Sequence, residues 1–407
     1  MKLLILGINY YPELTGIGVY NTEMCEYLTN AGHKVIISTG FPYYPQWKIE
    51  KQYRKKFFVT ENYRGVKIRR SYIYVPPTVT TKTRILHELS FIISSFLNLL
   101  FSKRPDMIIV ISPPLLLGIS AYLIKIFKKV QFIFHIQDLQ PDAALALGMI
   151  KKNKFIDMLY KIEKFIYKKA TLVSVISSGM REKVISKGVP KEKIILFPNW
   201  VDTDFIKPIG RQNKFREIYK LNNKFIILHA GNIGVKQGLE IILDVANSME
   251  DIKNLLFLIV GDGVRKQFLV KKAKESAITN IRFLLPQPKE LLAEMLSAAD
   301  VLIITQKGSI VDMVLPSKLL TYMASSTPII ASVNFNSEAA RVINQAKSGL
   351  IVKPENTETF AKSILRLRDS KKLREELGNN GRSYVSIHFE KSLILTRFQD
   401  LIYNLTK

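Results

Sequence analysis

The 407-residue sequence predicts an α/β protein with two doubly wound domains, each a parallel sheet covered by helices. Three observations predict this fold class. Continuous apolar runs of strand length alternate with helical patterns, which is typical of parallel sheets buried on both faces. The pattern is interrupted after Pro198 and then starts again. The length also exceeds what one hydrophobic core usually organises, so two domains of near-equal size are expected.

The strands of the two predicted sheets follow in order along the chain. In the first domain they are Leu3–Ile8, Lys34–Ser38, Met107–Ile111, Gln131–Ile136, Leu172–Ile176 and Ile194–Phe197. In the second they are Phe225–Ala230, Leu256–Val260, Ile281–Leu284, Val301–Ile304, Pro328–Ser332 and Gly349–Val352. A helix is expected over Tyr20–Ala31, and two more at Lys371–Asn380 and Glu390–Asn404. Between Val201 and Asn223 the periodicity is broken, so we predict domains at residues 1–203 and 204–387.

The composition limits the classes of protein to which the chain can belong. Its apolar start, Met1–Ile8, is too short for a signal peptide and has no cleavage site after it. The longest apolar stretch, Ile85–Phe101, falls short of the ~20 residues that a membrane-spanning helix needs. One cysteine, Cys25, cannot form an intramolecular disulfide, and the five histidines do not cluster as metal ligands. We therefore expect a cytoplasmic protein without a metal site.

The net charge of +26 is unevenly distributed, because residues 1–200 carry 30 of the 60 basic side chains but only 13 of the 34 acidic ones. Such a field attracts an anionic partner, which can be nucleic acid or an anionic lipid surface. No helix-turn-helix, zinc-finger or aromatic-basic RNA-binding signature accompanies the charge. We therefore expect no nucleic-acid partner, and a lysine-rich surface explains part of the excess.

Glycine-rich turns follow several predicted strands. Gly16 and Gly18 lie between the first strand and its helix, where backbone N–H groups can approach a phosphate. The second domain offers three further elements, which are Gly231–Gly238, Gly261–Gly263 and the helix start at Pro316-Ser317-Lys318. Lys236 and Lys318 can neutralise phosphate charge there. Each element alone is as easily structural, but their convergence favours a diphosphate ligand.

The sequence resembles the retaining GT-B glycosyltransferases of family 4 over nearly its whole length. The segments that carry this resemblance are Thr15–Gly18, Ala31–Val35, Phe197–Asp202 with Phe205, Val260–Gly263, Ala298–Val301 and Pro328–Ala331. The resemblance implies two Rossmann-like domains facing across a cleft, with a terminal helix, about 388–407, that returns to the first domain. It assigns the acceptor to the first domain and a nucleotide sugar, expected to be a UDP sugar, to the second.

Within that family the chain is most similar to the WbuB-like fucosaminyl and fucosyl transferases of O-antigen, capsule and colanic acid synthesis. The similar segments are Gly231–Gly234, Gln237–Glu240, Gln137–Pro141 and Ser112–Pro114. The resemblance implies a polyprenyl-diphosphate-linked glycan as acceptor, no cofactor and no metal. The residues expected to bind the donor are Gly16, Gly18, Gly231, Asn232, Lys236, Gln237, Gly261, Gly263, Gln287, Ser317, Lys318, Leu319 and Thr321.

The sequence departs from the family pattern at the donor site. The family usually has Arg and Lys where Asn232 and Gln237 stand, and a pair of Glu residues where Met313 and Thr321 stand, with Asp312 beside the first. Lys236 and Lys318 are expected to supply the missing charge. Thr321 is expected to contact the donor ribose.

Three further side chains are candidates for contact with the reacting sugar. His135 and Asp138 lie at the end of a predicted strand and can hydrogen-bond the donor sugar or the acceptor hydroxyl, although a satisfied buried histidine is an equal alternative. Glu13 lies beside the first glycine turn and is a candidate on the acceptor side.

Two stretches suggest binding to the anionic inner face of the cytoplasmic membrane. Lys151–Lys169 places Phe155, Met158, Leu159, Ile162, Phe165 and Ile166 at helical spacing, with Lys152, Lys154, Lys161, Lys164 and Lys168 mostly elsewhere on the helix. A basic amphipathic helix suits an anionic lipid surface, although packing against a sheet is the commoner role. Ile85–Phe101, preceded by the basic segment Tyr53–Arg70, is the second stretch.

Two other functions stay open at this point. A UDP-sugar 2-epimerase has the same fold, but such enzymes place carboxylates and histidines around the donor, in which this chain's candidate site is poor. A non-catalytic scaffold is the other alternative, because both family Glu residues are missing. Formation of a glycolipid, an epimer or no product separates the three functions.

Overall fold

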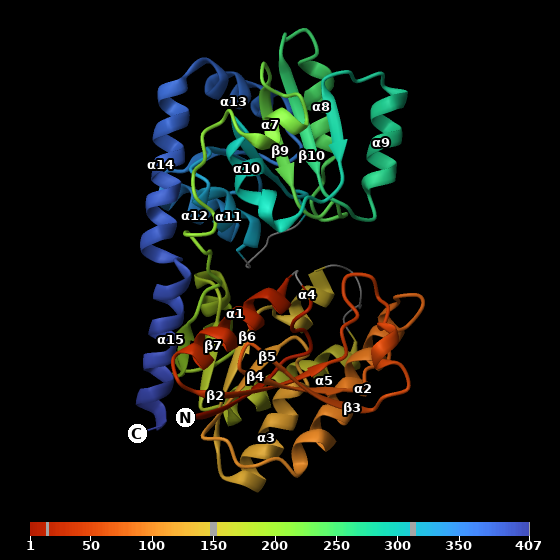
Figure 1. Ribbon diagram of the computed structural model, residues 1–407, viewed down its shortest axis with the longest axis vertical. Helices are drawn as coiled ribbons and strands as arrows, with labels where there is room; N and C mark the ends of the chain where they lie inside the picture. The colour runs from red at the N-terminus through yellow and green to blue at the C-terminus, as the bar shows by residue number, and fades with distance from the viewer. Residues whose placement is uncertain (14–15, 147–152, 310–314, 407) are drawn as a thin grey trace. The chain divides into compact units, whose positions relative to one another are not determined.

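The computed structural model describes residues 1–13, 16–146, 153–309 and 315–406. The chain divides into two compact units (Figure 1). Unit 1 consists of Met1–Asn199 together with Ile394–Lys407, and unit 2 of Trp200–Leu393. Each unit contains one β-sheet whose strands alternate with helices, which is the predicted fold class.

Unit 1 is built around an eight-stranded sheet in the order β3-β4-β2-β1-β5-β6-β7-β8. All neighbouring strands are parallel except β3 and β4, which pair antiparallel. Every residue of the central strand β5 is buried. The elements are β1 (Lys2–Leu6), α1 (Ile17–Asn30), β2 (Lys34–Gly40), η1 (Lys51–Tyr53), β3 (Phe58–Tyr63), β4 (Val66–Ser71), α2 (Thr81–Leu100), β5 (Met107–Ser112), α3 (Leu117–Lys128), β6 (Gln131–Ile136), α4 (Gln140–Ala146), α5 (Lys154–Lys169), β7 (Leu172–Val175), α6 (Ser178–Ser186), η2 (Lys191–Lys193) and β8 (Ile194–Leu196).

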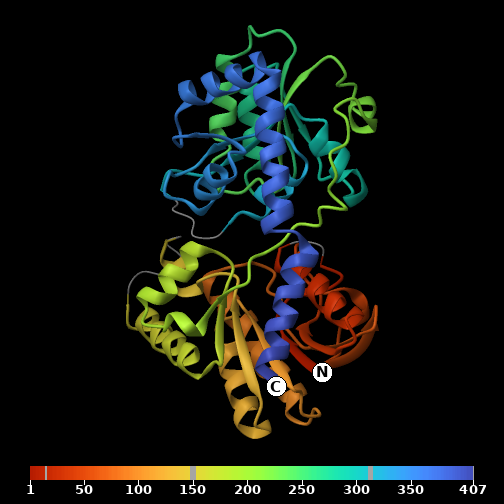
Figure 2. The ribbon, with the colours of Figure 1, turned by 90° about the vertical axis from the view of Figure 1, so that its left-hand side faces the viewer.

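The C-terminal helix α15 (Lys391–Thr406) adds its residues from Ile394 onward to unit 1. The Phe398 ring stacks on Phe197 with 3.9 Å between the ring centroids. Tyr27 Oη lies 2.7 Å from Thr396 Oγ1, which joins α15 to α1. The two ends of the chain therefore lie beside each other (Figure 2), with Thr406 Oγ1 3.0 Å from Met1 Sδ.

Unit 2 contains a six-stranded, wholly parallel sheet in the order β11-β10-β9-β12-β13-β14. One core packs α10, α11 and α12 on one face of the sheet, and a second packs α8, α9 and α13 on the other (Figure 1). The elements are α7 (Lys214–Ile218), β9 (Phe225–Ala230), α8 (Glu240–Ser248), β10 (Leu255–Val260), α9 (Lys266–Glu275), β11 (Ile281–Leu284), η3 (Lys289–Leu291), α10 (Leu292–Ser297), β12 (Val301–Thr305), α11 (Ser317–Ala324), β13 (Ile329–Ser332), α12 (Glu338–Ala346), β14 (Gly349–Val352), α13 (Thr357–Asp369) and α14 (Lys371–His388).

Each predicted strand corresponds to an observed one, but β3 and β4 were not predicted. Strand β4 alternates apolar and charged residues over positions 66–69. Strand β3 has one charged residue and lies at the edge of the sheet with exposed side chains on one face. Unit 2 begins slightly before the predicted boundary at residue 203, because Val201 packs in the unit 2 core and bridges to Glu390. None of the helices formed by the described residues has the length and hydropathy that crossing a membrane requires.

The strand order reverses at one place in each sheet. In unit 1 this place lies between β1 and β5, and in unit 2 between β9 and β12. In open α/β sheets a ligand usually binds beyond the carboxyl ends of the strands at such a reversal. The candidate sites of both units lie there.

Candidate functional site

The glycine turns of unit 2 pack directly against each other at the carboxyl ends of β9 and β10. Gly261 has φ +154°, and a Cβ at this position would lie 1.9 Å from the carbonyl oxygen of Gly231. A Cβ on Gly263 would lie 2.5 Å from the carbonyl oxygen of Ile233. The two turns are further joined by hydrogen bonds from Gly231 N to Val260 O and from Ile233 N to Asp262 O. No residue with a side chain fits at Gly261 or Gly263 without moving the backbone.

Lys318 reaches these turns from the first turn of α11. A Cβ on Gly231 would lie 3.3 Å from Lys318 Nζ, so the ammonium group stands next to the Gly231 backbone. Burial lowers the pKa of Lys318 to about 8. Within the described residues the ammonium group has no carboxylate at ion-pair distance. A half-buried cation with no carboxylate partner in the described part of the chain, beside a glycine turn, is suited to binding a phosphate group.

Tyr322 fixes the helix that carries Lys318. Its hydroxyl donates to the carbonyl oxygen of Ala230 over 2.9 Å and accepts from the Ala230 N–H over 2.8 Å. Ala230 is the last residue of β9, so Tyr322 ties α11 to the strand from which the glycine turn starts. Sequence analysis missed this residue, since a tyrosine within an apolar helix is equally typical of core packing.

On the glycine turn Gly231–Gly238, one predicted donor residue is bound within the turn and two have exposed side chains. Gln237 Oε1 accepts from Gly234 N over 3.2 Å, and its carbonyl oxygen accepts from Thr305 Oγ1 over 2.7 Å. The Asn232 side chain is exposed but faces Gly263. Lys236 is exposed, and its carbonyl oxygen accepts from the Lys307 N–H, which joins this turn to the end of β12 at the strand reversal.

The other predicted donor residues differ in their access to a ligand. Ser317 is exposed at the start of α11, and the partly buried Thr321 donates to the Ser317 carbonyl oxygen over 3.3 Å. The side chain of Leu319 lies within the hydrophobic core, so only its backbone can take part. Gln287 follows the edge strand β11 and is bound on both sides, by Tyr219 Oη and by the Leu285 carbonyl oxygen.

A cavity of about 450 Å³ lies at the strand reversal of unit 1. Three aromatic side chains from the segment after β2, Tyr43, Tyr44 and Trp47, form one part of its lining. From α2 it receives a cation and a carboxylate, Arg84 and Glu88, whose charged atoms lie 3.6 Å apart. The remaining lining residues are Ile8, Asn9, Gly16, Ile17, His87, Pro113 and Pro114. Aromatic rings beside charged groups suit a polar ligand with an apolar face, such as a sugar ring.

Glu13 binds the backbone of the aromatic segment that lines this cavity. Its Oε1 accepts from the backbone N–H groups of Tyr43 and Tyr44, over 2.9 and 3.0 Å, and its Oε2 accepts from Asn9 Nδ2 over 2.7 Å. Burial raises the pKa of Glu13, and these hydrogen bonds oppose the rise. Gly18 packs against the Glu13 carbonyl oxygen, where an added Cβ would lie at 2.9 Å. The carboxylate thus holds the aromatic segment in place.

His135 and Asp138 lie outside the lining of this cavity. His135 is buried in β6, with Nδ1 2.9 Å from Ser174 Oγ and Nε2 2.9 Å from Gln137 Nε2. Burial lowers its pKa to about 3, so the ring is neutral near pH 7. Gln137 also pairs with Asn199 through two amide hydrogen bonds. Asp138 is half-buried and follows β6.

Several sequence-based expectations fall on residues that the structure does not describe. Thr15, Lys151, Lys152, Asp312 and Met313 lie outside the described residues. Among the residues described, no group of three or more His, Cys, Asp or Glu side chains is arranged to hold a metal ion.

The two stretches considered for membrane binding differ in what they expose. In α5 the side chains of Ile156, Ile166 and Tyr167 are buried, and only Phe155 and Met158 among its apolar residues are well exposed. In α2 three apolar side chains, Leu86, Ile93 and Leu97, are exposed along one stripe. Near α2 the exposed apolar residues are Phe57, Phe58 and Phe101, and the exposed basic residues are Arg54, Lys55, Lys56, Lys103 and Arg104.

Two family models match the chain, one in each unit. Residues 15–200 match the glycosyl transferase 4-like domain, and residues 211–384 match the glycosyl transferases group 1 domain. A putative colanic acid biosynthesis glycosyl transferase, WcaI of Escherichia coli K12, is 35% identical over 373 residues. That similarity covers 89% of this chain and 91% of WcaI.

Solved structures share the fold at low sequence identity. Sucrose-phosphate synthase from Thermosynechococcus elongatus has a TM-score of 0.75 at 18% identity, over 99% of this chain and 98% of its own. HepE of Anabaena in complex with UDP has a TM-score of 0.74 at 13% identity, over 99% of this chain and 100% of its own.

Proposed function

Because the chain belongs to the group 1 glycosyl transferases, we propose that it transfers a sugar from a UDP-activated donor to a lipid-linked glycan. The proposed sugar is a deoxy or amino sugar such as N-acetylfucosamine or fucose, and the proposed acceptor is a polyprenyl-diphosphate-linked oligosaccharide. The product would serve O-antigen, capsule or exopolysaccharide synthesis. Similarity to WcaI, named for colanic acid biosynthesis, supports the pathway, and the UDP bound to HepE supports the donor.

The observation that carries this proposal is the position of Lys318 in unit 2. Its half-buried ammonium group stands beside the Gly231 backbone at the strand reversal, without a carboxylate partner among the described residues. A donor diphosphate bound there would supply the missing anion. Lys236 on the same turn would add a second, exposed charge. Ser317 and Thr321 would face the nucleoside.

We assign the acceptor to the cavity of unit 1. The aromatic rings after β2 would pack against the apolar face of an acceptor sugar, while Arg84 and Glu88 would bind its polar groups. Glu13 would act as a positioning residue, because its Oε1 already binds the segment that carries those rings and its Oε2 binds Asn9. A contact of His135 or Asp138 with substrate remains a prediction.

The proposed transfer retains the anomeric configuration of the sugar. Negative charge builds on the leaving diphosphate as the glycosidic bond breaks, and positive groups placed there lower the barrier. Lys318 and Lys236 would provide this stabilisation, so the proposal assigns no step to a metal ion. The activity is expected to persist in the presence of a metal chelator.

We place the protein at the inner face of the cytoplasmic membrane, where a polyprenyl-linked acceptor is embedded. The exposed apolar stripe of α2, with basic side chains nearby, supports this location better than α5 does. Apolar groups entering the interface and basic groups near anionic lipids both favour binding, the latter by about 1 kcal/mol per residue.

The first test is a thermal-shift screen of the purified protein against UDP, GDP, ADP, CMP and their sugars. A ligand at about 100 times its Kd should stabilise the fold by ~2.7 kcal/mol, which is readily measured. The sugar that gives a selective shift is then incubated with a polyprenyl-diphosphate-linked acceptor. A glycolipid product supports the proposal. An epimer of the donor supports a 2-epimerase, and no shift with any nucleotide sugar supports a scaffold.

A further inference from the structure

Unit 2 contains a cavity of its own, at the opposite end of its strands from the glycine turns. It has a volume of about 370 Å³ and opens beside Asp300 and Thr327, which precede β12 and β13. The glycine turns follow the carboxyl ends of β9 and β10. All strands of this sheet are parallel, so the cavity and the candidate donor site lie at opposite ends of the strands.

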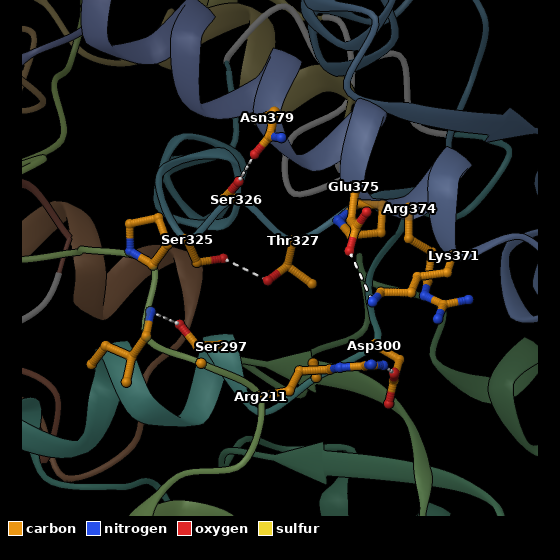
Figure 3. A pocket seen from close by; sticks show the side chains of 15 residues that line it. Arg211, Ser297, Asp300, Ser325, Ser326, Thr327, Lys371, Arg374, Glu375 and Asn379 are labelled. Carbon is orange, nitrogen blue, oxygen red and sulfur yellow. Dashed lines mark hydrogen bonds and ion pairs between the residues drawn. The ribbon is translucent and has the colours of Figure 1, made fainter.

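Two groups of side chains face each other across this cavity (Figure 3). Helix α14 contributes Lys371, Arg374, Glu375 and Asn379, and the opposite side carries Arg211 and Asp300. Hydroxyl groups complete the lining, from Ser297 at the end of α10 and from the turn Ser325–Thr327 after α11. The lining is therefore rich in cations and in neutral hydrogen-bonding groups.

The positive charge of Arg211 is not fully balanced by its partner. Arg211 pairs with Asp300, but the same carboxylate accepts from Arg216 Nη2 over 2.8 Å and from Ile226 N over 2.9 Å. The side chains of Asp300 and Arg216 are only 1% and 3% exposed, so this pair is fixed in the interior. Arg216 already neutralises Asp300, and Arg211 brings a second cation to it.

Arg374 also has no ion-pair partner among the residues that the structure describes. Its Nη1 donates to the carbonyl oxygens of Leu367 and Arg368, and no carboxylate lies within ion-pair distance of it in the described part of the chain. Burial lowers the pKa of Arg374, the nearby charge of Arg211 lowers it further, and the charge of Glu375 opposes the change. Among the described residues, Lys371 on the same wall has one carboxylate partner, the exposed Glu375 at 3.6 Å.

We propose that this cavity binds a small phosphomonoester that carries hydroxyl groups, such as a sugar phosphate. The phosphate would lie between Arg211, Arg374 and Lys371, where a dianion balances the excess positive charge. The hydroxylated part would hydrogen-bond to the turn Ser325–Thr327 and to Asn379. The volume is within the range of small-ligand sites, about 300–1,000 Å³.

Occupation of this cavity would be transmitted to the donor site through α11. Ser325 follows directly after this helix, and Ser326 Oγ donates to Asn379 Oδ1 over 2.9 Å. Helix α14 packs closely here, since a Cβ on Gly378 would lie 2.1 Å from the Ser326 carbonyl oxygen. Lys318 lies in the first turn of the same short helix. A ligand that fixes the end of α11 would therefore change the affinity for the donor. This coupling rests on the proposed function, whereas the phosphomonoester site itself does not.

The test measures calorimetric binding of glucose 6-phosphate, inorganic phosphate and glucose to the full chain. We expect glucose 6-phosphate to bind, inorganic phosphate to bind more weakly and glucose not to bind. Lys371→Glu should weaken glucose 6-phosphate binding at least about tenfold. Lys318→Ala should leave it unchanged.

The chain offers a matched control in α9. Lys271 and Glu275 form an exposed pair with the same spacing and the same 3.6 Å distance as Lys371 and Glu375, and their exposures are 76% and 63% against 72% and 62%. Lys271→Glu should bind glucose 6-phosphate like the unaltered chain. Equal weakening in both variants would show a general charge effect and overturn the proposal.

Two further outcomes decide the remaining questions. Loss of glucose 6-phosphate binding in Lys318→Ala, with binding unaffected in Lys371→Glu, would place the phosphate at the donor site and overturn the cavity assignment. If glucose 6-phosphate did not bind to the unaltered chain, the cavity assignment would also be overturned. For the coupling, the Kd of UDP-glucose is measured with and without saturating glucose 6-phosphate. A change of about fivefold or more, absent in Lys371→Glu, supports it. An unchanged Kd overturns the coupling alone, and no binding of any nucleotide sugar contradicts the proposed function instead.

Discussion

The affinity for a donor diphosphate should depend on pH through Lys318. Burial lowers the pKa of this ammonium group to about 8 in the free protein, so a change from pH 7 to pH 9 deprotonates it. With a pKa of about 8, the charged fraction falls from roughly 0.9 at pH 7 to roughly 0.1 at pH 9. If only the charged form binds the diphosphate, the Kd should rise about tenfold, or ~1.4 kcal/mol. The direction is fixed: binding an anion favours the protonated lysine, so affinity is lost as the pH rises through 8.

The assay is calorimetric binding of UDP-glucose between pH 7 and pH 9, with three proteins compared. Lys318→Arg keeps its charge throughout this range, so its Kd should vary much less than that of the unaltered chain. Lys236→Arg changes an exposed lysine on the neighbouring turn and should keep the full pH dependence. Titration of the ligand itself would appear equally in all three. If Lys318→Arg and the unaltered chain gave the same profile, Lys318 would not contact the diphosphate.

Three further predictions test the fold and the membrane surface. Asp300→Ala should lower the free energy of unfolding by about 3–5 kcal/mol in urea titrations, because it leaves Arg216 buried without its carboxylate. The control Asp244→Ala removes a half-exposed pair with Lys272 and should lower the free energy of unfolding by less than about 1 kcal/mol. Acidification from pH 6.5 to 4 should destabilise the protein, because burial lowers the pKa of His87 to about 4 and of His135 to about 3. Both side chains therefore take up protons preferentially in the unfolded state, and each can lower the free energy of unfolding by up to ~1.4 kcal/mol per pH unit. Urea midpoints that do not change over this range would contradict the assignment. The double variant Ile93→Glu, Leu97→Glu should no longer co-sediment with vesicles that contain anionic lipid. The control variant Val264→Glu, Leu285→Glu changes two exposed apolar positions of unit 2 and should still co-sediment. Vesicle binding retained in the α2 variant would show that this stripe is not the membrane surface.

The sequence was sufficient to predict the elements whose signal is local. The buried run of β5 and the glycines after β9 and β10 indicated parallel strands, two of them ending in glycine turns, and the structure has these strands and turns. That the turns bind a ligand stays a prediction. The hairpin β3–β4 was missed because its inward side includes a charged residue. Arg70 is buried there, where Glu61 and the carbonyl oxygens of Gly40 and Tyr11 accept its hydrogen bonds.

Features that depend on contacts between distant segments were not predictable. The position of His135 at a strand end was visible in the sequence, but its partner Ser174 comes from the next strand. The hydrogen bonds of Glu13 to the segment after β2 likewise join residues 30 positions apart. The cavity of unit 2 combines segments around Arg211, Asp300, Ser326 and Lys371, none of which indicates a site by itself.

The return of α15 to unit 1 has a consequence for how the chain folds during synthesis. Residues 200–393, which form unit 2, leave the ribosome as one uninterrupted segment and can complete their core at once. The folding of unit 1 cannot be completed at that stage, because Phe398 and Thr396 are translated after the whole of unit 2. These two residues contact Phe197 and Tyr27 of unit 1. Until then the apolar surface beneath α15 is open to water and to other chains. The first unit to be translated is therefore the second to be finished.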